Sequence, residues 1–348
     1  MSTRKQWLLY GATGYSGSHI AEKAVAKGFR PVIAGRREAE TRAVAERLGL
    51  EWRVVDLGDQ AALNALVREF STVMHAAGPF INTYEPMIKA CLAGGTHYLD
   101  ITGEIPVFEG LAAFDTEARK AGIMMMPGCG FDMVPGDCLA LYLKRQMPDT
   151  TRFDIAVSFE GTLTHGTILS TLANTNPLPH VRRNHKLTHL PQPIGREVDF
   201  GPGRCGGLAT AYSATFGDAS TAWRTTGIPD ITAWLRPAPE FAALANIKSA
   251  ADVASLPAGP SKEELDTIPT IFVAQVGNDA GESRAVRLVT PQIYAITFDA
   301  AATIAQFVHE GTFRAGFQTP AGVFGEDFIL EFDGCRREDW QPGALPAE

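Results

Sequence analysis

The stretch "LLYGATGYSG", residues 8–17, decides the fold that this sequence predicts. Its apolar first three residues are typical of a short buried strand, and they run directly into Gly11, Gly14 and Gly17. A strand that enters a helix through a glycine-rich turn points the first N–H groups of that helix at one spot. Those groups and the helix dipole stabilise an anion there. The spacing G-x-x-G-x-x-G in this context favours the diphosphate of a dinucleotide over a merely structural turn.

Strand-like and helix-like stretches alternate around this turn through the first part of the chain. Amphipathic stretches such as "SHIAEKAVAKG" and "QAALNALVREF" separate short apolar runs. Regular alternation of this kind predicts an α/β fold, a Rossmann-type doubly wound parallel sheet with helices on both faces. The predicted strands are "WLLYG", "PVIAG", "EWRVVDL", "TVMHAAG", "HYLDITG" and "GIMMMPG".

The pattern changes after residue 150 and predicts a second region of mixed structure. "RFDIAVSFEG", "TIFVAQVGND" and "SRAVRLVTP" are expected to be strands, and "HGTILSTLAN" and "YAITFDAAATIAQFVHEG" helices. Residues 175–206 are rich in Pro, Gly and His and show no periodicity, which favours a long functional or mobile loop.

Composition excludes several classes of protein. The chain has 348 residues, 45% of them hydrophobic, and a formal net charge of -8, which does not favour binding to nucleic acid. No apolar run has membrane-spanning length, so no membrane association is expected. The five cysteines are scattered without a CxxC pair, which favours neither disulfides nor a metal site and indicates a cytoplasmic protein.

The end of the second predicted strand indicates which dinucleotide binds. The acidic residue that would hydrogen-bond the ribose 2′-hydroxyl of NAD is missing, and the sequence reads "AGRRE" instead. A guanidinium can hold a 2′-phosphate bidentately, whereas a carboxylate would repel it. We therefore expect NADPH, bound through Arg36 with help from Arg37; the alternative is two solvated arginines at a helix start.

Further cofactor contacts are expected at the carboxyl ends of the strands, where ligands bind in folds of this class. "VVDLGD" places Asp56 and Leu57 near the adenine, although Asp56 is equally well read as a helix N-cap. "HAAGPF" leaves room beside the nicotinamide ribose. The complete set of expected cofactor-binding residues is Gly11, Thr13, Gly14, Tyr15, Ser16, Gly17, Arg36, Arg37, Asp56, Leu57, Ala77, Gly78, Pro79 and Gly103.

Several motifs, taken in order, carry a resemblance to a known family. "YGATGYSG", "AGRRE", "AAGPF", "HYLDITGE" and "PGCGFDMVPGD" resemble the saccharopine dehydrogenase-like oxidoreductases, a group that includes the trans-acting enoyl reductases that partner polyketide synthases. The later pieces "GTLTHGTILSTL" and "FQTPAGVFGEDF" are also similar to such proteins.

The resemblance implies an organisation and an activity. It implies an NADP-binding Rossmann domain over residues 1–135 and an inserted mixed α/β domain over residues 136–290 for substrate and homodimer contacts. A segment over residues 291–340 is expected to return to the first domain. The implied activity is NADPH-dependent reduction of a C=C or C=N bond in a small metabolite or carrier-bound substrate. The alternative is a redox sensor that binds NADPH without turnover.

Reduction by NADPH usually needs a proton source near the acceptor. The chain has no Tyr-x-x-x-Lys pair in this domain, because no lysine follows Tyr98 at that spacing. The candidate proton donors are Tyr98, Asp132 and His165. Asp132 has an alternative role as a helix cap, and His165 an alternative position exposed at a helix start.

The segment "HVRRNHKLTHLPQPIGREVDFGPGR" concentrates arginines and histidines. No acidic residue or cysteine lies among the histidines of residues 180–189, which disfavours a metal site. A basic lid over an anionic substrate and a plain solvated loop both remain open. The residues in question are His180, Arg182, Arg183, His185, Lys186, His189, Arg196 and Arg204.

Overall fold

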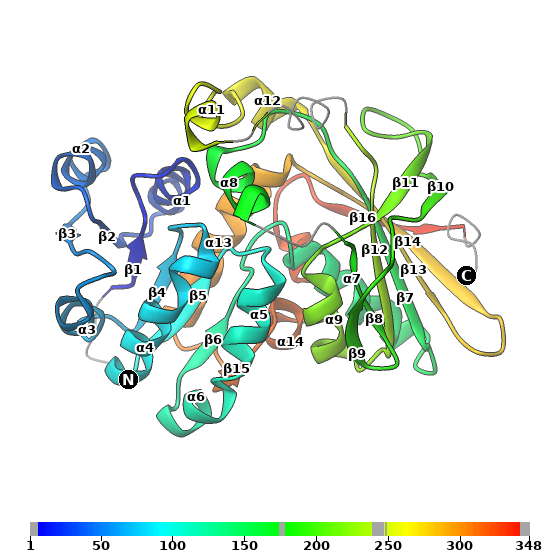
Figure 1. The fold of residues 1–348 in the computed structure, drawn as a ribbon, viewed down its shortest axis with the longest axis horizontal. Coiled ribbons are helices and arrows are strands. Elements are labelled where there is room, and N and C mark those ends of the chain that lie inside the picture. Colours follow the sequence, from blue (N-terminus) through cyan, green and yellow to red (C-terminus); the bar gives the residue numbers. More distant parts are fainter. Residues whose placement is uncertain (1–5, 174–177, 239–246, 248, 342–348) are drawn as a thin grey trace. The chain divides into compact units, whose positions relative to one another are not determined.

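The computed structural model describes residues 6–173, 178–238, 247 and 249–341 and divides the chain into two compact units. Unit 1 comprises Met1–Gly130 and Thr297–Gln318, and unit 2 comprises Phe131–Ile296 and Thr319–Glu348. The expected boundaries lay after residues 135 and 290. The structure makes its first division after Gly130 and returns a shorter C-terminal segment to unit 1 (Figure 1).

Unit 1 contains a seven-stranded parallel sheet in the order β15-β6-β5-β4-β1-β2-β3. The predicted Rossmann-type fold and its six strands are confirmed, and the short β15 extends the sheet at one edge. The strands are β1 (Leu8–Tyr10), β2 (Val32–Gly35), β3 (Trp52–Val54), β4 (Thr72–His75), β5 (His97–Asp100), β6 (Met124–Met126) and β15 (Gly316–Phe317).

Helices connect these strands in the alternation that the sequence predicts (Figure 1). Three of them, α2, α4 and α6, end on Gly49, Gly95 and Gly122, each with a left-handed backbone that glycine adopts without strain. The helical elements are α1 (Tyr15–Ala26), α2 (Glu38–Leu48), α3 (Gln60–Val67), η1 (Phe80–Asn82), α4 (Tyr84–Gly94), α5 (Ile105–Ala112) and α6 (Asp115–Ala121).

The returning segment includes most of α13 (Ile293–His309), and specific contacts hold it to the start of unit 1. Asp299 of α13 forms ion pairs with Lys23 of α1, at 3.1 Å, and with Lys27, the C-cap of α1, at 2.5 Å. The Trp7 indole donates to Gln306 Oε1 at 3.0 Å. The last part of this helix therefore completes the layer that α1 begins.

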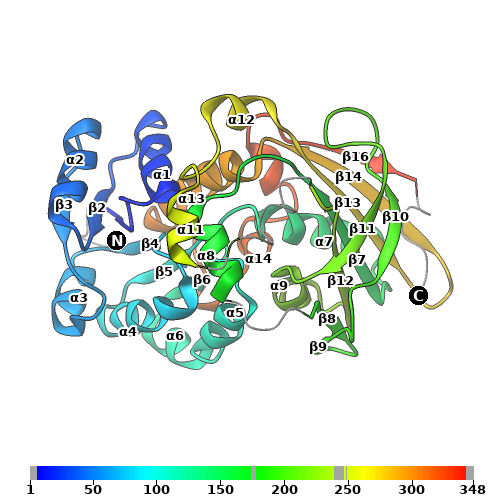
Figure 2. The same ribbon diagram turned by 45° about the horizontal axis from the view of Figure 1, so that its top comes forward.

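Unit 2 is built on a mixed nine-stranded sheet with the path β10-β11-β12-β7-β13-β14-β16, in which β8 pairs with β12 and β9 with β8 (Figure 2). Only β7 and β12 run parallel, so the predicted mixed second domain is confirmed. The strands are β7 (Arg152–Ser158), β8 (His180–Arg183), β9 (Lys186–His189), β10 (Gly195–Asp199), β11 (Leu208–Ala214), β12 (Asp230–Leu235), β13 (Thr270–Gly277), β14 (Ser283–Thr290) and β16 (Arg336–Trp340).

Two helices, α7 and α9, pack against each other and against this sheet at β13 and β12. Asp137 of α7 also accepts a hydrogen bond from the backbone N–H of Ala321 at 2.7 Å, which anchors the C-terminal segment. The helical elements of unit 2 are α7 (Val134–Gln146), α8 (His165–Ala173), α9 (Asp218–Thr226), α11 (Ala250–Ala254), α12 (Lys262–Thr267), α14 (Pro320–Phe324) and η2 (Phe328–Glu331).

The expectation of an aperiodic loop over residues 175–206 is wrong for its described part. Residues 174–177 lie outside the described residues, but β8, β9 and β10 follow. A two-residue turn at Asn184 and His185, both with positive φ, joins β8 to β9. In β10, Arg196 and Val198 are buried while their neighbours are exposed. The alternation escaped detection because an arginine occupies the buried face.

Two arginines of the supposed lid are therefore internal. Arg182 is 4% exposed and donates to the carbonyl of Ala219 at 2.7 Å. The guanidinium carbon of Arg196 lies 3.8 Å from the ring centre of Trp234, and its Nη1 lies 3.7 Å from Asp154 Oδ1. A basic lid cannot include these two side chains, because both are buried within unit 2.

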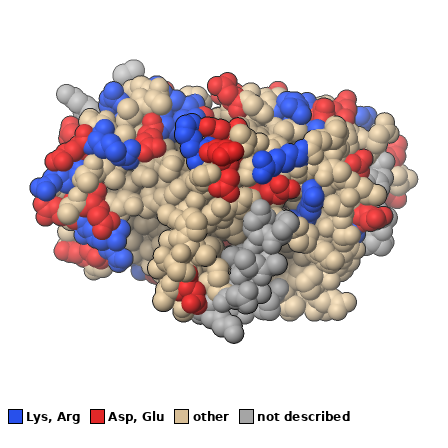
Figure 3. All heavy atoms as spheres, turned by 90° about the horizontal axis from the view of Figure 1, so that it is seen from above, with Lys and Arg blue, Asp and Glu red and all other residues tan. Residues whose placement is uncertain are grey.

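No described helix is both long enough and apolar enough to cross a membrane. On the face shown in Figure 3, basic and acidic side chains lie interspersed.

Arg196 gives a test of this correction. Arg196→Ala should lower the free energy of unfolding by about 2 to 4 kcal/mol, because it leaves the buried Asp154 with fewer partners. Arg204→Ala is the matched control: Arg204 belongs to the same segment but its side chain is half exposed and reaches Glu160 only at 3.4 Å. Urea unfolding measures both, and equal losses would contradict an internal role for Arg196.

Candidate functional site

Gly11 and Gly17 bring three backbone segments of unit 1 into close contact. Gly11 has φ +93°, and a methyl carbon there would lie 2.8 Å from the backbone of Ala76 and of Ala77. A methyl carbon at Gly17 would lie 2.2 Å from the carbonyl oxygen of Gly11. These two glycines therefore let α1 start directly against the ends of β1 and β4.

Gly14 differs from its two neighbours in the motif. A methyl carbon there would contact only Gly11 O, at 3.5 Å, so the fold itself does not need a glycine. Gly14 is the N-cap of α1, no side chain caps this helix, and its first turn carries no acidic residue. The start of α1 is therefore open to an anion, which fits a phosphate group held by backbone N–H groups.

Tyr15, Ser16 and Thr13 complete the predicted turn. The Tyr15 ring lies 4.4 Å from that of His19 and 6.0 Å from that of Phe298, so its side chain packs α1 against α13. Thr13 approaches Gly35 of β2, where a methyl carbon would lie 3.6 Å from its Cγ2. Thr13 and Ser16 are both half-buried.

The two predicted arginines stand in different surroundings. Arg37 is the N-cap of α2 and forms an ion pair with Glu40. Arg36 is exposed and forms no ion pair with the residues that the structure describes. Its charge lowers the pKa of Tyr10, on which burial has the larger, opposite effect. Arg36 is therefore the guanidinium that is free to meet a phosphate at this edge of the sheet.

Tyr10, Arg36 and Asp56 gather at the ends of β1, β2 and β3. Burial and the nearby Asp56 raise the pKa of Tyr10 to about 12, and its hydroxyl donates to Val55 O at 3.0 Å. Asp56 accepts from the N–H of Gly58 at 2.8 Å. The alternative reading of Asp56 as a helix N-cap is wrong, because Asp59 caps α3.

The neighbouring Leu57 is half-buried. Asp56 and Leu57 therefore stay available as predicted adenine contacts.

The loop that follows β4 contains Ala77, Gly78 and Pro79 and is held from two sides. The Thr83 hydroxyl donates to Ala77 O at 2.7 Å. The Glu104 carboxylate accepts from the backbone N–H of Phe80 at 2.9 Å and of Ile81 at 2.8 Å. Sequence reasoning missed Glu104, and its only signal was its position directly after the predicted Gly103.

His75 supports the same loop from within the sheet. The single hydrogen of the Thr83 hydroxyl goes to Ala77 O, so His75 Nε2, at 3.0 Å, must donate to Thr83 Oγ1. Burial lowers the pKa of His75 to about 3, which keeps the ring neutral. His75 Nδ1 is then a buried acceptor without a hydrogen-bond partner among the described residues.

Asp100 connects the ends of β5 and β6. Its carboxylate accepts from the N–H groups of Thr102 and Gly128, both at 2.9 Å, and from the Tyr98 hydroxyl at 2.7 Å. Burial raises the pKa of Asp100 to about 6. The "PGCG" segment is thus fixed against the strand end by one carboxylate.

Among the predicted proton donors, Tyr98 is fully buried. Its hydroxyl donates to Asp100, and burial raises its pKa well above the usual range. These contacts give Tyr98 a structural task in unit 1, and we do not retain it as a proton donor.

His165 and Asp132 both belong to unit 2. His165 is the first residue of α8, and its Nε2 lies 2.9 Å from Leu256 O, so this nitrogen donates to a carbonyl within the unit. Asp132 is half-buried just before α7, whose N-cap is Met133, so the capping alternative does not hold. The charge of Asp132 acts instead on Tyr294, a residue that sequence reasoning missed.

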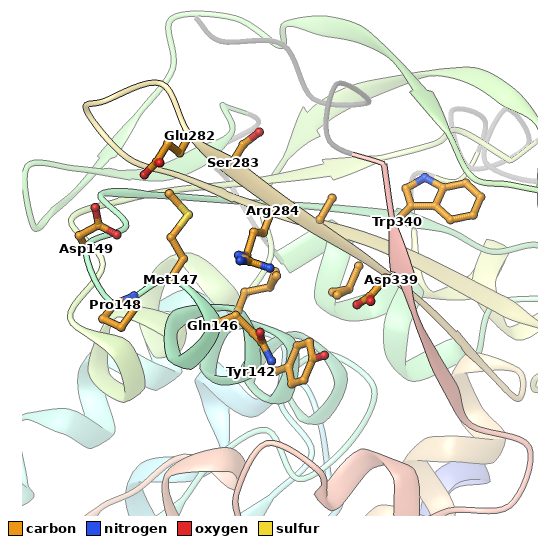
Figure 4. Close-up of a pocket in the computed structure, with 13 residues that line it drawn as sticks. Tyr142, Gln146, Met147, Pro148, Asp149, Glu282, Ser283, Arg284, Asp339 and Trp340 are labelled. Carbon is orange, nitrogen blue, oxygen red and sulfur yellow. The ribbon is translucent and has the colours of Figure 1, made fainter.

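A cavity of about 530 Å³ lies in unit 2. The end of α7 and the start of β14 line it, with Asp149 and Glu282 at one end and Asp339 and Trp340 at the other (Figure 4). None of the predicted site residues lines this cavity. It is therefore not the predicted cofactor site.

Comparison with known proteins agrees with this geometry. Residues 7–126 match the saccharopine dehydrogenase NADP binding domain, which confirms the predicted resemblance over this part of the chain. A putative trans-acting enoyl reductase of Mycobacterium tuberculosis is 32% identical over 216 residues, which are 56% of this chain and 51% of that protein. The chain thus spans about half the length of this relative.

Two solved structures share the fold. Saccharopine dehydrogenase (L-Glu forming) from Saccharomyces cerevisiae has a TM-score of 0.63 at 14% identity and covers 97% of this chain and 100% of its own. Homospermidine synthase from Legionella pneumophila, in complex with NAD, has a TM-score of 0.66 at 11% identity. The match covers 100% of this chain and 95% of that protein. These two structures confirm the saccharopine dehydrogenase-like fold that the sequence predicts, and the match over residues 7–126 agrees with the expected NADP site.

The three glycines predict a contrast between two variants. Gly17→Ala should lower the free energy of unfolding by about 2 kcal/mol or more, because its methyl group would overlap a backbone oxygen. Gly14→Ala should fold normally yet lose at least about tenfold in NADPH affinity, because its methyl group would obstruct the phosphate. Thermal unfolding and fluorescence titration with NADPH separate the two effects. Normal NADPH affinity of Gly14→Ala would contradict the proposed phosphate site at the start of α1.

The raised pKa of Asp100 predicts that the free energy of unfolding depends on pH. Because its folded pKa of about 6 lies above the ordinary 3.8, its protonated form stabilises the fold at low pH, and this contribution is lost as pH rises through 6. Relative to Asp100→Asn, the wild type should lose about 2 to 3 kcal/mol of unfolding free energy between pH 4 and pH 7. Urea unfolding at several pH values provides the measurement, and parallel curves for the two proteins would contradict it.

Proposed function

We propose that this protein is an NADPH-dependent reductase that transfers a hydride to the C=C bond of an enoyl thioester, carried on a partner protein or on a small metabolite. The observation that carries the cofactor choice is the exposed Arg36 after β2, which forms no ion pair with any described residue. The enoyl thioester is favoured by the name of the M. tuberculosis relative. Reduction of a C=N bond is the competing reaction within the same class.

The residues of unit 1 would bind and orient the cofactor. The start of α1 would hold the diphosphate, Arg36 the 2′-phosphate, and Asp56 and Leu57 the adenine. Thr83 and Glu104 fix the backbone of residues 77–81, which would lie beside the nicotinamide ribose. When bound, the dihydronicotinamide supplies the hydride.

A redox sensor that binds NADPH without turnover is the second candidate. Two of the three predicted proton donors favour it, because Tyr98 and His165 already donate to groups inside their own units. Hydride transfer to an enoyl thioester makes modest demands on a protein acid, since solvent can protonate the product enolate. The enzyme is therefore the better supported of the two functions.

We place the enzyme in the cytoplasm, where its five free cysteines would stay reduced. A homodimer is proposed on the family resemblance alone.

Arg36 and Arg37 provide the test of cofactor choice. Arg36→Ala should lose about tenfold or more in affinity for NADPH and little for NADH, because only NADPH carries the 2′-phosphate. Arg37→Ala is the matched control and should change NADPH affinity less, because Arg37 is already paired with Glu40. Titration of both variants with NADPH and with NADH measures these affinities. Equal NADPH affinity of Arg36→Ala and wild type would contradict the assignment.

A substrate panel tests the reaction. NADPH oxidation is followed with enoyl thioesters, with cyclic imines, and with 2-oxo acids plus amino acids. The proposal expects turnover of the enoyl thioesters. Turnover of imines alone would show that the enzyme reduces a C=N bond instead of a C=C bond. NADPH binding without turnover of any of these substrates would favour the redox sensor.

A further inference from the structure

The order of strands in unit 1 separates the two halves of a bound dinucleotide. In this sheet β1 lies between β2 and β4. A cofactor with its diphosphate at the start of α1 and its 2′-phosphate on Arg36, which follows β2, keeps its adenosine on the β2 side. The nicotinamide half then extends over the end of β4. The chain there begins against the glycine turn, because a methyl carbon on Gly11 would lie 2.8 Å from the backbone of Ala76 and Ala77.

Thr83 holds the loop after β4 instead of capping its own helix. It is the N-cap of α4, where a threonine side chain ordinarily accepts from an N–H group of the first turn, but it makes no such hydrogen bond. Its hydroxyl lies instead 2.7 Å from Ala77 O and 3.2 Å from Pro79 O. Thr83 therefore gives up the usual cap in favour of the loop.

His75 sets the direction of the Thr83 hydroxyl. His75 is the last residue of β4 and is fully buried. Its Nε2 donates to Thr83 Oγ1 at 3.0 Å, which leaves the hydrogen of Thr83 to point at Ala77 O. The donation thus runs from the interior of the sheet through Thr83 to the backbone of the loop.

This donation has a cost at the other ring nitrogen. A neutral imidazole has one donor and one acceptor nitrogen, and His75 Nδ1, the acceptor, has no hydrogen-bond partner among the described residues. The rings of Tyr10, Phe80 and Tyr98 surround His75, with centres 5.7, 5.5 and 6.4 Å from its own. An apolar side chain in these surroundings would avoid a buried unpaired nitrogen. Packing alone therefore does not account for a histidine here, whereas its bond to Thr83 does.

The rest of the loop is fixed separately. Glu104 accepts from the backbone N–H groups of Phe80 and Ile81. Thr83 reaches the earlier part, at Ala77, and Gly78 lies between the two attachments without a side chain. Loss of the Thr83 hydrogen bond would therefore free the part of the loop next to the glycine turn.

We infer that His75 and Thr83 are positioning residues, which hold the loop of residues 77–81 in the arrangement that accepts the nicotinamide half of NADPH. The inference rests on the proposed function, because it takes NADPH as the cofactor. It assigns the two halves of the cofactor to separate parts of unit 1, the adenosine half to Arg36 and the nicotinamide half to this loop. A loop that is ordered before binding lowers the entropic cost of binding.

Two ligands separate these contributions. Adenosine 2′,5′-bisphosphate contains the adenine, the 2′-phosphate and one 5′-phosphate of NADPH but no nicotinamide ribose. Its Kd therefore reports on the adenosine side, whereas the Kd of NADPH reports on both sides. Calorimetric titration of each folded variant gives the ratio of the Kd of NADPH to that of the bisphosphate. A general loss of stability does not change this ratio in a specific direction.

His75→Leu removes the donor, and His75→Gln keeps an N–H group at a similar reach. We expect His75→Leu to raise the ratio at least about fivefold, which corresponds to the loss of one hydrogen bond. The Kd of the bisphosphate should not change. His75→Gln should stay within about twofold of the wild type, because the donor to Thr83 is retained.

Thr83 provides a second, independent pair of variants. Thr83→Val should raise the ratio as His75→Leu does, whereas Thr83→Ser should not. The combined His75→Leu/Thr83→Val variant should raise it no further than the larger single change, because both act through one chain of hydrogen bonds. Thr83 is half-buried, so this pair decides the question if His75→Leu does not fold.

His97 is the matched control. It is a buried histidine on the neighbouring strand β5 and accepts from the N–H of Met124 at 2.9 Å. Because β4 and β5 are parallel and His97 pairs with Thr72, it lies at the opposite end of the sheet from His75. His97→Leu should therefore leave the ratio within about twofold of the wild type, even if it lowers the stability of the fold.

The possible failures are distinguishable. A ratio for His75→Leu equal to that of the wild type, or equal ratios for Thr83→Val and Thr83→Ser, would overturn the inference and leave the NADPH site in place. An equal rise in His97→Leu would also overturn it, because the effect would then not belong to the loop. Failure of the wild type to bind NADPH would overturn the proposed function itself.

Discussion

The close contact between the start of α1 and the ends of β1 and β4 is the constraint on which the proposed cofactor site depends. Gly11 and Gly17 permit it, because a single methyl group at either position would overlap backbone atoms. The contact leaves the first turn of α1 uncapped and brings Gly14 to the surface. A helix end without a side-chain cap needs another partner for its N–H groups, and a phosphate supplies it.

Both units use buried or half-buried polar side chains to fix backbone at strand and helix ends. In unit 1, Asp100 holds the segment after β6, and Glu104 holds the segment after β4. In unit 2, Thr164 and Tyr294 fix the first turn of α8 around Thr167. In each case the hydrogen bonds reduce the conformational freedom of the backbone or side chain that they hold.

The sequence was sufficient wherever the signal is local. The strands and helices of unit 1 follow from periodicity and glycine positions, and the distinction between Arg36 and Asp at the end of β2 needs only one position. The sequence was insufficient to predict a strand where a polar side chain occupies one of the buried positions of its apolar–polar alternation. Arg196 can occupy a buried strand position because it forms a cation–π contact with Trp234 and an ion pair with Asp154. Neither partner is near Arg196 in sequence.

Contacts between segments that are distant in the chain also could not be predicted from the sequence. Thr167 and Tyr294 are 127 residues apart, and no motif connects them. Asp56 and Asp59 are both plausible caps for α3, and only the hydrogen bond from Ala62 to Asp59 decides between them. Glu104 resembled an ordinary helix-start glutamate until the structure showed its two backbone partners.

The measurement that most directly tests the central claim is the transfer of deuterium from NADPH carrying two deuterium atoms at C4 of the nicotinamide to crotonyl N-acetylcysteamine. The account predicts a butyryl product that gains one deuterium, bound at the β-carbon, for each NADPH oxidised. Oxidation of NADPH without deuterium in the product would contradict direct hydride transfer to the C=C bond. Stable binding without oxidation would contradict the assignment as a reductase of such substrates.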